Sequence, residues 1–481
     1  MAQIHILPVN QTVSAPEGSP LLAVLRSCGL APDAPCGGEG RCGKCHVTVN
    51  GASVLACRTS VTGDMTVLLP EVPAQPMLSQ TYQPAPPGYG QGYRLAVDVG
   101  TTTLAASLLT ADGQELGAAG MKNPQAAYGA DVVSRIRYGL AGHTGELTAC
   151  VRQTLEQMTR QLCRGAGISA DAVTLVSVVG NPAMQQLFLG MPVENLAKPP
   201  FRPVLTQARV SPAGDVLPLW KEAQLITVPD ISGYVGADTV ACMLATQLHN
   251  REEMTLLVDI GTNGEMVLGS CHGLVACATA AGPALEGAHI SCGMRAETGA
   301  IDRVRWENSR FMCHVIGDAP ATGICGSGLV DAIAAALNGG FLNSRGKLLG
   351  AEPLQLADGV CLTQEDIRQF QTAKGAIAAG IQLMMQHLQV DYADIARVQL
   401  AGAFGSFLDP ASACRTGLLP PQLLEKVEAV GNGALSGAKL LACQPRLVQK
   451  TAELARTVQC LDLSAQPQFP RTFANCMRFD G

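Results

Sequence analysis

Four cysteines near the N-terminus have the spacing of a metal site. Cys36, Cys42, Cys45 and Cys57 are separated by five, two and eleven residues. The glycines between the first three let the backbone wrap closely around an inorganic cluster. Four thiolates at this loop spacing are typical of a plant-type [2Fe–2S] cluster. Structural zinc, the alternative, usually takes two Cys-x2–4-Cys pairs, and only one such pair is present.

The other fourteen of the 18 cysteines show no Cys-x2-Cys spacing. We expect them to be buried apolar residues in a reducing compartment, with Cys28 in the core on a predicted helix. Gly38, Gly40 and Gly43 match the dinucleotide fingerprint Gly-x-Gly-x-x-Gly. That match lies inside the cysteine loop, with no strand before it and no helix after it, and we therefore discard it.

Two apolar segments, 161 residues apart, each end in Asp-x-Gly-Thr. No Gly-x4-Gly-Lys-[Ser/Thr] motif occurs, which excludes a P-loop ATPase. Glycine and threonine at a hairpin tip contact phosphate oxygens, while a strand-end aspartate holds Mg²⁺ through water. The repeat predicts two similar lobes that face each other across ATP. The candidate ATP-binding residues are Gly100, Thr101, Thr102, Thr103, Gly261, Thr262, Asn263 and Gly264, and Mg²⁺ is assigned to Asp98 and Asp259.

Two further glycine-rich segments follow. Residues 398–406 form a predicted strand that enters a glycine turn and then a helix beginning at Ser406. We interpret this turn as the adenosine-binding element, with a plain strand–helix junction as the alternative. Residues 323–328 predict another helix start that lines the same cleft. The residues assigned to ATP here are Gly402, Ala403, Phe404, Gly405, Gly326 and Ser327.

Glu265 and Asp238 are candidate catalytic residues, together with Asp98 and Asp259, because a carboxylate can orient the water that attacks a phosphate. A hydrogen-bonding role at a loop or helix start is the alternative for Glu265 and Asp238. The eight histidines show no His-x3-His or His-Glu-x2-His pairing, and no Gly-x-Ser-x-Gly elbow occurs. These absences argue against a catalytic metalloenzyme or a serine hydrolase.

The element pattern divides the chain. Residues 1–72 alternate short strands and turns and are predicted to be a [2Fe–2S] ferredoxin-like domain of the α+β β-grasp class. Its predicted strands are 5–9, 47–49 and 65–69, and its helix is 21–28 with Ser19-Pro20 as N-cap and first turn. Residues 73–92 hold five prolines, three glycines and no charge, and are predicted to be a linker. Residues 93–252 and 253–481 are predicted to form the two lobes of an α/β actin-like (RNase H-like) ATPase domain, the second with the adenosine turn.

Composition excludes several partners. Hydrophobic residues make up 47% of the 481 residues and charged residues 15%, with a net charge of −6 and no Lys/Arg run longer than two. A nucleic-acid partner is therefore disfavoured. No basic segment precedes an apolar one near the N-terminus, and the long uncharged stretch 266–285 contains Gly, Pro and His. We expect no membrane span and a cytoplasmic protein.

The whole chain from about Cys36 onward resembles the reductive activators of corrinoid proteins, a family within the actin/hexokinase/Hsp70 ATPase superfamily. The segments that carry this resemblance, besides the cysteine loop and the two hairpins, are 123–125, 128–132, 179–184, 233–238, 281–287, 323–328, 371–376 and 401–405.

The resemblance implies an ATP-hydrolysing enzyme that returns a Co(II) corrinoid protein of a methyltransferase system to Co(I). Its electron would come from a [2Fe–2S] cluster on Cys36, Cys42, Cys45 and Cys57, with Mg-ATP in the actin-like domain. The implied partners are the corrinoid protein and an external low-potential electron donor, and a homodimer remains open. Family members usually carry an extra domain before the first hairpin, and we expect this chain to lack it, because Gly92 runs almost directly into Leu95.

Three other functions remain open at this stage. An ATP-gated electron donor could serve another low-potential metalloenzyme. A small-molecule kinase could carry a redox-sensing domain. An actin-class assembly protein would form ATP-dependent filaments.

Overall fold

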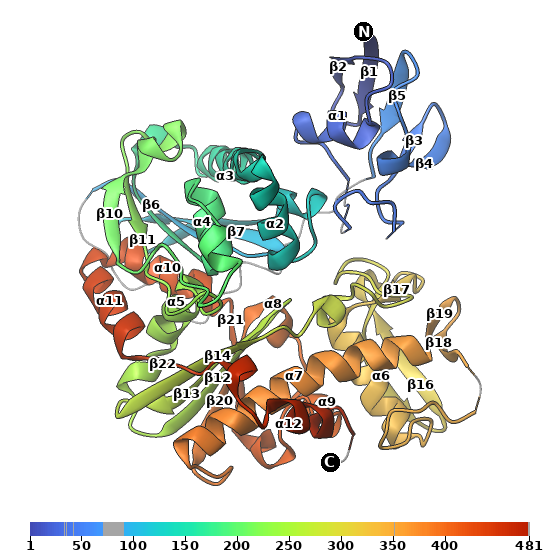
Figure 1. Ribbon diagram of the computed structural model, residues 1–481, viewed down its shortest axis with the longest axis vertical. Helices are drawn as coiled ribbons and strands as arrows, with labels where there is room; N and C mark the ends of the chain where they lie inside the picture. Colours follow the sequence, from blue (N-terminus) through green and yellow to red (C-terminus); the bar gives the residue numbers. More distant parts are fainter. Residues whose placement is uncertain (33, 35, 42, 71–90, 351, 480–481) are drawn as a thin grey trace.

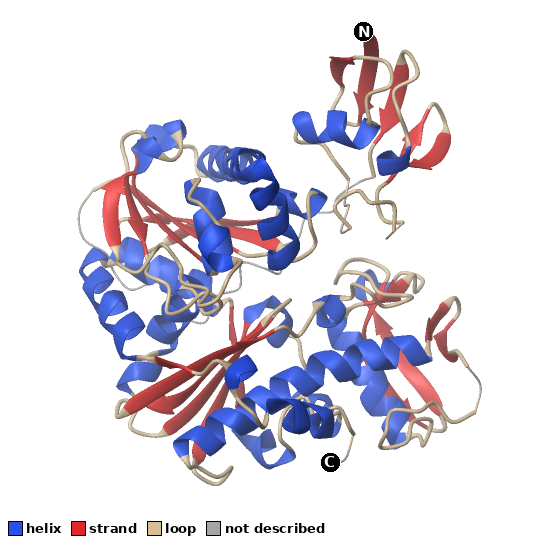
Figure 2. Cartoon of the chain, viewed as in Figure 1, coloured by secondary structure: helices blue, strands red, loops and turns tan. Residues whose placement is uncertain are grey.

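The computed structural model describes residues 1–32, 34, 36–41, 43–70, 91–350 and 352–479, apart from the side chain of Ala403. Three large sheets organise these residues (Figures 1 and 2). One lies in a small N-terminal domain, drawn in blue, and the other two lie in two larger lobes. The predicted linker falls almost entirely within 71–90, outside the described residues.

The N-terminal domain is a β-grasp, as predicted. Its five-stranded sheet has the order β2-β1-β5-β3-β4, in which β1 and β5 are parallel neighbours. Helix α1 packs on the sheet, because Leu21 and Leu25 share one face of the helix and are fully buried with Ile4, Ile6 and Val67. The elements are β1 (Ala2–Leu7), β2 (Gln11–Ala15), α1 (Leu21–Ser27), β3 (His46–Val49), β4 (Ala52–Leu55) and β5 (Met65–Leu68).

Two details of this domain differ from the prediction. Strand β1 ends at Leu7 and not at Val9, because Pro8 has no N–H with which to continue the ladder. Pro20 and not Ser19 is the N-cap of α1, and no side chain caps the helix.

The first lobe is built on a six-stranded sheet of order β10-β11-β9-β6-β7-β8. Helices α3 and α4 cover one face of this sheet, where Leu147, Val151 and Leu187 join Val97 and Leu108 in one core. Its elements are β6 (Tyr93–Val99), β7 (Thr103–Thr110), β8 (Glu115–Lys122), α2 (Val132–Tyr138), α3 (Thr144–Gly165), β9 (Val173–Gly180), α4 (Pro182–Leu189), β10 (Arg209–Pro212), β11 (Gln224–Thr227) and α5 (Ala237–Thr246).

The second lobe repeats the central arrangement of the first. In the first lobe β6 runs antiparallel to β7 and parallel to β9, and in the second β12 runs antiparallel to β13 and parallel to β20. The sheet order is β21-β20-β12-β13-β14-β22. The strands of this sheet are β12 (Met254–Ile260), β13 (Gly264–Ser270), β14 (Gly273–Thr279), β20 (Ile395–Ala401), β21 (Val427–Gly431) and β22 (Gln459–Cys460). The predicted internal repeat and two-lobed actin-like fold are confirmed.

Smaller sheets and helices complete the second lobe. The long helix α7 covers the outer face of the large sheet through Phe370, Ile377 and Ile381, and it begins in a capping box of Thr363 and Asp366. The remaining elements are β15 (Ala300–Glu307), β16 (Arg310–Val315), β17 (Gly323–Ile324), α6 (Gly326–Asn338), β18 (Leu354–Ala357), β19 (Val360–Leu362), α7 (Gln364–Leu388), α8 (Gly402–Gly405), α9 (Pro410–Arg415), α10 (Gly433–Cys443), α11 (Val448–Thr457) and α12 (Phe469–Cys476).

Helices α5 and α10 lie between the two large sheets (Figure 1). Met243 of α5 and Leu435 of α10 are fully buried in one core with Ala96 of the first sheet and Leu257 of the second. The lobes therefore share a continuous apolar layer, and any movement between them must carry or shear these two helices.

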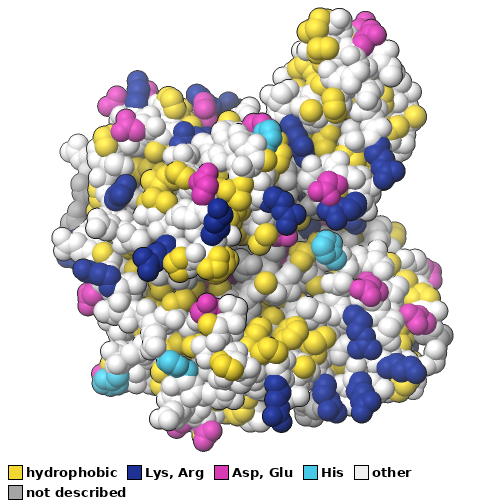
Figure 3. Space-filling view, in the orientation of Figure 1, with side chains coloured by type: hydrophobic (Ala, Val, Ile, Leu, Met, Phe, Trp, Pro, Cys, Tyr) yellow, Lys and Arg dark blue, Asp and Glu magenta, His cyan; other side chains and the backbone are white. Residues whose placement is uncertain are grey.

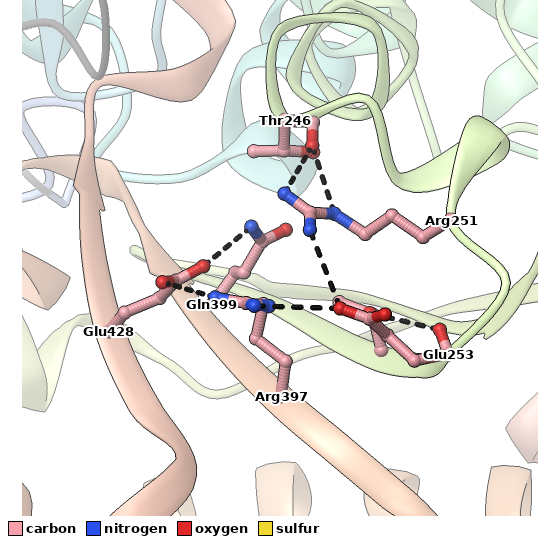
Figure 4. A network of polar contacts seen from close by, with 7 residues as sticks. Thr246, Arg251, Glu253, Arg397, Gln399 and Glu428 are labelled. Atoms are coloured by element: carbon pink, nitrogen blue, oxygen red, sulfur yellow. Dashed lines mark hydrogen bonds and ion pairs between the residues drawn. The ribbon is translucent and has the colours of Figure 1, made fainter.

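A polar network holds the chain where it passes from α5 into β12 (Figure 4). Arg251 donates to the carbonyl of Thr246 at 3.1 Å, and Arg397 on β20 donates to Glu428 on β21 at 2.8 Å. Glu253 lies between the two arginines, 3.8 Å from Arg251 and 3.5 Å from Arg397. This network ties the end of α5 to three strands of the second sheet.

The cysteine prediction is partly wrong. Cys271 and Cys460 are exposed, because they lie at the β13–β14 turn and on the two-residue edge strand β22. Cys28 packs against the ferredoxin core and is half-buried. In the part of the chain that the structure describes, no helix is both long and apolar enough to cross a membrane.

Candidate functional site

A deep pocket opens between the two lobes, and both Asp-x-Gly-Thr hairpins contribute to it. Most candidate residues of the sequence line this pocket, although they come from five separate parts of the chain. These are Asp98, Gly100, Thr101, Thr102, Thr103, Asp238, Asp259, Gly261, Thr262, Asn263, Glu265, Gly326, Ser327, Gly402 and Phe404. Gly264 and Gly405 are not among the lining residues, and the side chain of Ala403 is outside the described part.

The tips of the two hairpins meet at one carboxylate. Thr102 donates its hydroxyl to Oε2 of Glu286 at 2.6 Å, and Thr262 donates to the same oxygen at 3.0 Å. The two threonine hydroxyls lie 3.3 Å apart. Glu286, a lining residue of the pocket, thus links the two lobes. Sequence reasoning quoted its segment for the family resemblance but assigned Glu286 no role.

Two asparagines hold the first hairpin, and neither was predicted as a site residue. Asn432 donates its amide to Oδ2 of Asp98 at 2.9 Å, and Asn181 donates to the hydroxyl of Thr101 at 2.9 Å. Each is also a helix N-cap directly after a strand: Asn181 begins α4 and Asn432 begins α10. The sequence signal is therefore an Asn at a strand–helix junction. Because Asn is a common N-cap residue, this signal alone does not indicate a functional site.

Four partly buried carboxyl groups lie together in the pocket. Burial raises the pKa of Asp98 to about 7, although the amide of Asn432 opposes the rise and Asp238 adds to it. Burial, then the charges of Asp238 and Asp98, raise the pKa of Asp259 to about 7. Desolvation likewise raises the pKa of Asp238 to about 6 and holds that of Glu265 well above its ordinary value. Glu265 lies directly opposite Asp259 across the β12–β13 pair.

This cluster has the chemistry of a cation site. Oxygen ligands are those that Mg²⁺ prefers, and a buried group of acids costs the least when a cation neutralises it. Arg295 and Glu286 lie at the same pocket, so the lining carries both signs of charge. Asp98 and Asp259, one from each lobe, are the residues that could hold Mg²⁺, with Asp238 and Glu265 beside them.

The glycine turn after β20 packs against the second aspartate. Gly402 has a φ of +84°, and a Cβ there would lie 2.5 Å from Oδ1 of Asp259. Only glycine meets both requirements. The predicted helix start at Ser406 is wrong: α8 spans Gly402–Gly405, and Ser406 is its C-cap, donating its hydroxyl to the carbonyl of Gly402 at 3.0 Å.

The cysteine loop lies at the end of the ferredoxin domain that faces the ATPase lobes (Figure 1). Cys45 is 1% exposed, and Cys36 and Cys57 are half-buried. The N–H of Ala56 donates to the carbonyl of Cys45 at 2.9 Å, which brings the segment of Cys57 beside that of Cys45. Cys42 lies outside the described residues.

The loop backbone fits an iron–sulfur cluster. Gly37 and Gly38 have φ values of +71° and +96°, conformations that turn the chain sharply and that side chains rarely adopt. Such turns aim backbone N–H groups at cluster sulfides, and these hydrogen bonds help to set the reduction potential. The donor set is cysteine thiol, the ligand type of [2Fe–2S] clusters.

The fold and the two sites define the class: a [2Fe–2S] ferredoxin domain joined to an actin-like ATPase. Comparison with known proteins agrees. The model for 2Fe-2S iron-sulfur cluster binding domains matches residues 4–67. The models for the RACo middle region and for the C-terminal ASKHA domain of RACo match residues 93–251 and 253–480.

Individual relatives narrow the class. The chain is 33% identical over 412 residues to the corrinoid activation enzyme RamQ of Eubacterium limosum, covering 79% of this chain and 69% of that one. It is 28% identical over 398 residues to the [Co(II) methylated amine-specific corrinoid protein] reductase of Methanosarcina barkeri, covering 76% and 73%. A solved reductive activator for corrinoid, iron-sulfur protein superposes with a TM-score of 0.74 at 27% identity, covering 99% and 98%.

The chain belongs to the family of reductive activators of corrinoid proteins. The model of the family's middle region matches residues 93–251, which hold the first hairpin and the first lobe. The expectation that this chain lacks a domain before the first hairpin stays a prediction.

Proposed function

We propose that this protein is an ATP-dependent reductive activator that returns the Co(II) corrinoid of a methyltransferase system to Co(I). The observation that carries the proposal is the joining, in one chain of this family, of a four-cysteine ferredoxin loop and a two-lobed nucleotide pocket. The cluster supplies one electron at low potential when it is bound. The protein's own residues hold the nucleotide, shield the site and position the two domains.

ATP is needed because electron transfer from the [2Fe–2S] cluster to Co(II) is thermodynamically unfavourable. Plant-type [2Fe–2S] clusters have potentials of about −400 mV, and in a one-electron couple each further ~59 mV is a tenfold change in the equilibrium constant. Closure of two lobes on a nucleotide supplies differential binding energy that can select one state of a partner. ATP then works as a conformational gate and not as a phosphoryl donor to a small molecule.

Each pocket residue has a role in this scheme. Asp98 and Asp259 hold Mg²⁺ through water from opposite lobes, and the threonines and backbone of both hairpin tips bind phosphate oxygens. Glu265 or Asp238 orients the attacking water. The turn Gly402–Gly405 and the start of α6 at Gly326 and Ser327 accept the adenosine. Cys36, Cys42, Cys45 and Cys57 ligate the cluster.

The partners follow from the chemistry. A corrinoid protein accepts the electron, and an external low-potential donor restores the cluster, since the cluster holds a single electron. We place this activity in the cytoplasm, where ATP is abundant and cysteine ligands stay reduced. A homodimer is compatible with this scheme but is not required by it.

The test is anaerobic spectroscopy of a purified Co(II) corrinoid protein mixed with this protein and a reductant. Co(I) should form only when Mg-ATP is added. Two variants serve as controls: Asp98→Asn removes the Mg²⁺ ligand, and Cys45→Ser removes a cluster ligand. Both should abolish Co(I) formation, Asp98→Asn with the cluster spectrum intact. Failure with several corrinoid partners, despite a loaded cluster and bound ATP, would favour another low-potential metalloenzyme as acceptor.

A further inference from the structure

Arg26 of the ferredoxin domain makes several contacts with the first ATPase lobe. Arg26, in the last turn of α1, donates its Nε to the carbonyl of Ala127 at 3.1 Å, and its Nη2 also donates to that carbonyl. The guanidinium carbon lies 4.9 Å from the ring centroid of Tyr128 and 5.9 Å from that of Tyr138. Hydrogen bonds from a charged planar group, combined with ring stacking, are a contact that lysine does not reproduce.

The same guanidinium also holds the cysteine loop. Nη2 of Arg26 donates to the carbonyl of Gly37 at 2.9 Å, one residue beyond the predicted ligand Cys36. Gly37 approaches the lobe as well, because a Cβ built on it would lie 3.5 Å from the carbonyl of Tyr128. A single side chain therefore connects the cluster-binding loop to the ATPase domain. Figure 3 shows several Lys and Arg side chains around this junction.

The segment that Arg26 contacts leads straight to the phosphate hairpin. The N–H of Asn123 donates to the carbonyl of Thr102 at 2.9 Å, and its side-chain amide donates to the carbonyl of Gly100 at 2.8 Å. Asn123 is fully buried and caps the short 3₁₀ helix Pro124–Ala127, which ends at the carbonyl that Arg26 binds. Six residues, 123–128, thus span the distance from the nucleotide hairpin to the cluster loop.

The charge on Arg26 would act on a cluster held by this loop, because its guanidinium binds the carbonyl of Gly37. Reduction adds one negative charge, and a nearby cation stabilises that state, so a guanidinium on the loop raises the reduction potential. The effect depends on where the guanidinium is held, and Ala127 and Tyr128 hold it. A shift of the 100–103 hairpin on binding phosphate would move the 123–128 segment and with it the guanidinium.

We infer that Arg26 is a positioning residue that links nucleotide occupancy of the first hairpin to the reduction potential of the cluster. Linkage is reciprocal: if nucleotide shifts the potential, reduction must shift nucleotide affinity by the same factor. Only the cluster and the nucleotide pocket take part in this linkage, which does not depend on which protein accepts the electron.

Arg58 provides a matched control. Its Nη2 donates to the carbonyl of Gly40 in the same loop at 2.9 Å, so it places a second cation beside the cluster. Among the contacts of the described residues, Arg58 has none with the ATPase lobes. Arg26 and Arg58 therefore share the local electrostatic role, and only Arg26 has the connection between domains.

The experiment is an anaerobic potentiometric titration of the full-length, cluster-loaded protein, with and without a non-hydrolysable Mg-ATP analogue. For the wild type we expect the analogue to shift the reduction potential by at least about 40 mV. This shift corresponds to a fivefold difference in nucleotide affinity between the oxidised and reduced protein, since a tenfold difference equals about 59 mV. Arg26→Gln and Arg58→Gln should both lower the potential without nucleotide. Only Arg26→Gln should lose the nucleotide-dependent shift.

Calorimetry gives the reciprocal reading. The Kd of the analogue should differ at least fivefold between oxidised and reduced wild type, and less than twofold in Arg26→Gln. If Arg26→Gln fails to load its cluster, Tyr128→Leu takes its place, because it alters the same contact from the ATPase side and leaves the ferredoxin sequence intact. This variant should also lose the nucleotide-dependent shift in potential. The inference is overturned if the wild type shows no shift, if Arg26→Gln keeps it, or if Arg58→Gln loses it as well.

Discussion

The two hairpins of the ATPase domain share a motif but not an environment. In each, a central strand of the sheet ends in Asp-x-Gly-Thr, and a threonine at the hairpin tip donates a hydrogen bond to Glu286. Across the strand pair, however, Asp98 faces Ala105, whereas Asp259 faces Glu265. The first aspartate has an amide partner in Asn432, and the second has the backbone of Gly402 against it.

The difference divides the work between the lobes. A second carboxylate lies opposite the strand-end aspartate only in the second lobe, which favours Glu265 over Asp238 of the first lobe as the residue that orients the attacking water. The first hairpin instead carries the Asn123 contacts that lead to the ferredoxin domain. Under the proposals above, the two similar hairpins would share the cation, whereas the second would serve hydrolysis and the first would communicate with the ferredoxin domain.

The largest expected effect is on Mg-ATP binding and tests the feature that the two hairpins share, a strand-end aspartate facing the cation. Asp98→Asn and Asp259→Asn each remove a charge facing the same cation, and each should weaken Mg-ATP binding by about 100-fold or more. Titration calorimetry with and without Mg²⁺ measures this, and Asp131→Asn, at an N-cap of the first lobe outside the pocket lining, is the control. If one of the two variants bound Mg-ATP normally, the cation would be held from one lobe only.

The next effect tests the asymmetry. Glu265→Gln keeps the shape of the side chain but removes its ability to accept a proton, and it should lower ATP hydrolysis by about 100-fold with ATP affinity nearly unchanged. Asp238→Asn is the comparison, since both acids lie beside the pocket cation site. A larger loss in Asp238→Asn than in Glu265→Gln would move the water-orienting role to α5. Equal losses of affinity in both would assign them to cation binding.

A pH series sharpens the comparison further. Between the ordinary carboxyl pKa of 3.8 and the raised values of about 7, the folded protein keeps protons on Asp98 and Asp259 that the unfolded chain has lost. The free energy of unfolding without Mg²⁺ should therefore fall as pH rises from about 4 to 7. Mg²⁺ binds the ionised groups, so its stabilising effect should grow through the same range.

Thermal unfolding at pH 6 and pH 8, with and without Mg-ATP, measures both trends. The rise in Tm on adding Mg-ATP should be clearly larger at pH 8. Asp259→Asn should flatten the pH dependence of the metal-free protein and also raise its stability at pH 8, because a buried charge is gone. A Tm increment that is the same at both pH values would mean that these acids do not titrate together with cation binding.

The sequence predicted those parts of the site that depend on local chemistry. Asp-x-Gly-Thr after an apolar strand and the cysteine spacing are each complete within a few residues, and both led to the correct fold. The sequence did not identify Glu286, Asn432 and Arg26, because their partners are far away in the chain. Arg26 binds a backbone carbonyl 101 residues away, and such an acceptor has no side-chain signature. Asn432 lies 334 residues from Asp98, where only the packing of α10 between the lobes brings the two together.

The smallest effect isolates the amide that distinguishes the first aspartate. Asn432→Ser keeps an oxygen that can cap α10 but removes the N–H₂ group that donates to Asp98, whereas Asn432→Ala removes both. That donor favours the ionised carboxylate, so its loss should move the midpoint of Mg²⁺ binding to higher pH in both variants. Only the alanine variant should also lose about 1 kcal/mol of stability from the missing cap. Denaturant unfolding and Mg²⁺ titration across pH separate the two. If the midpoint moved only in the alanine variant, Asn432 would act only as a helix cap. The Asn123 contacts would then be what distinguishes the first hairpin from the second.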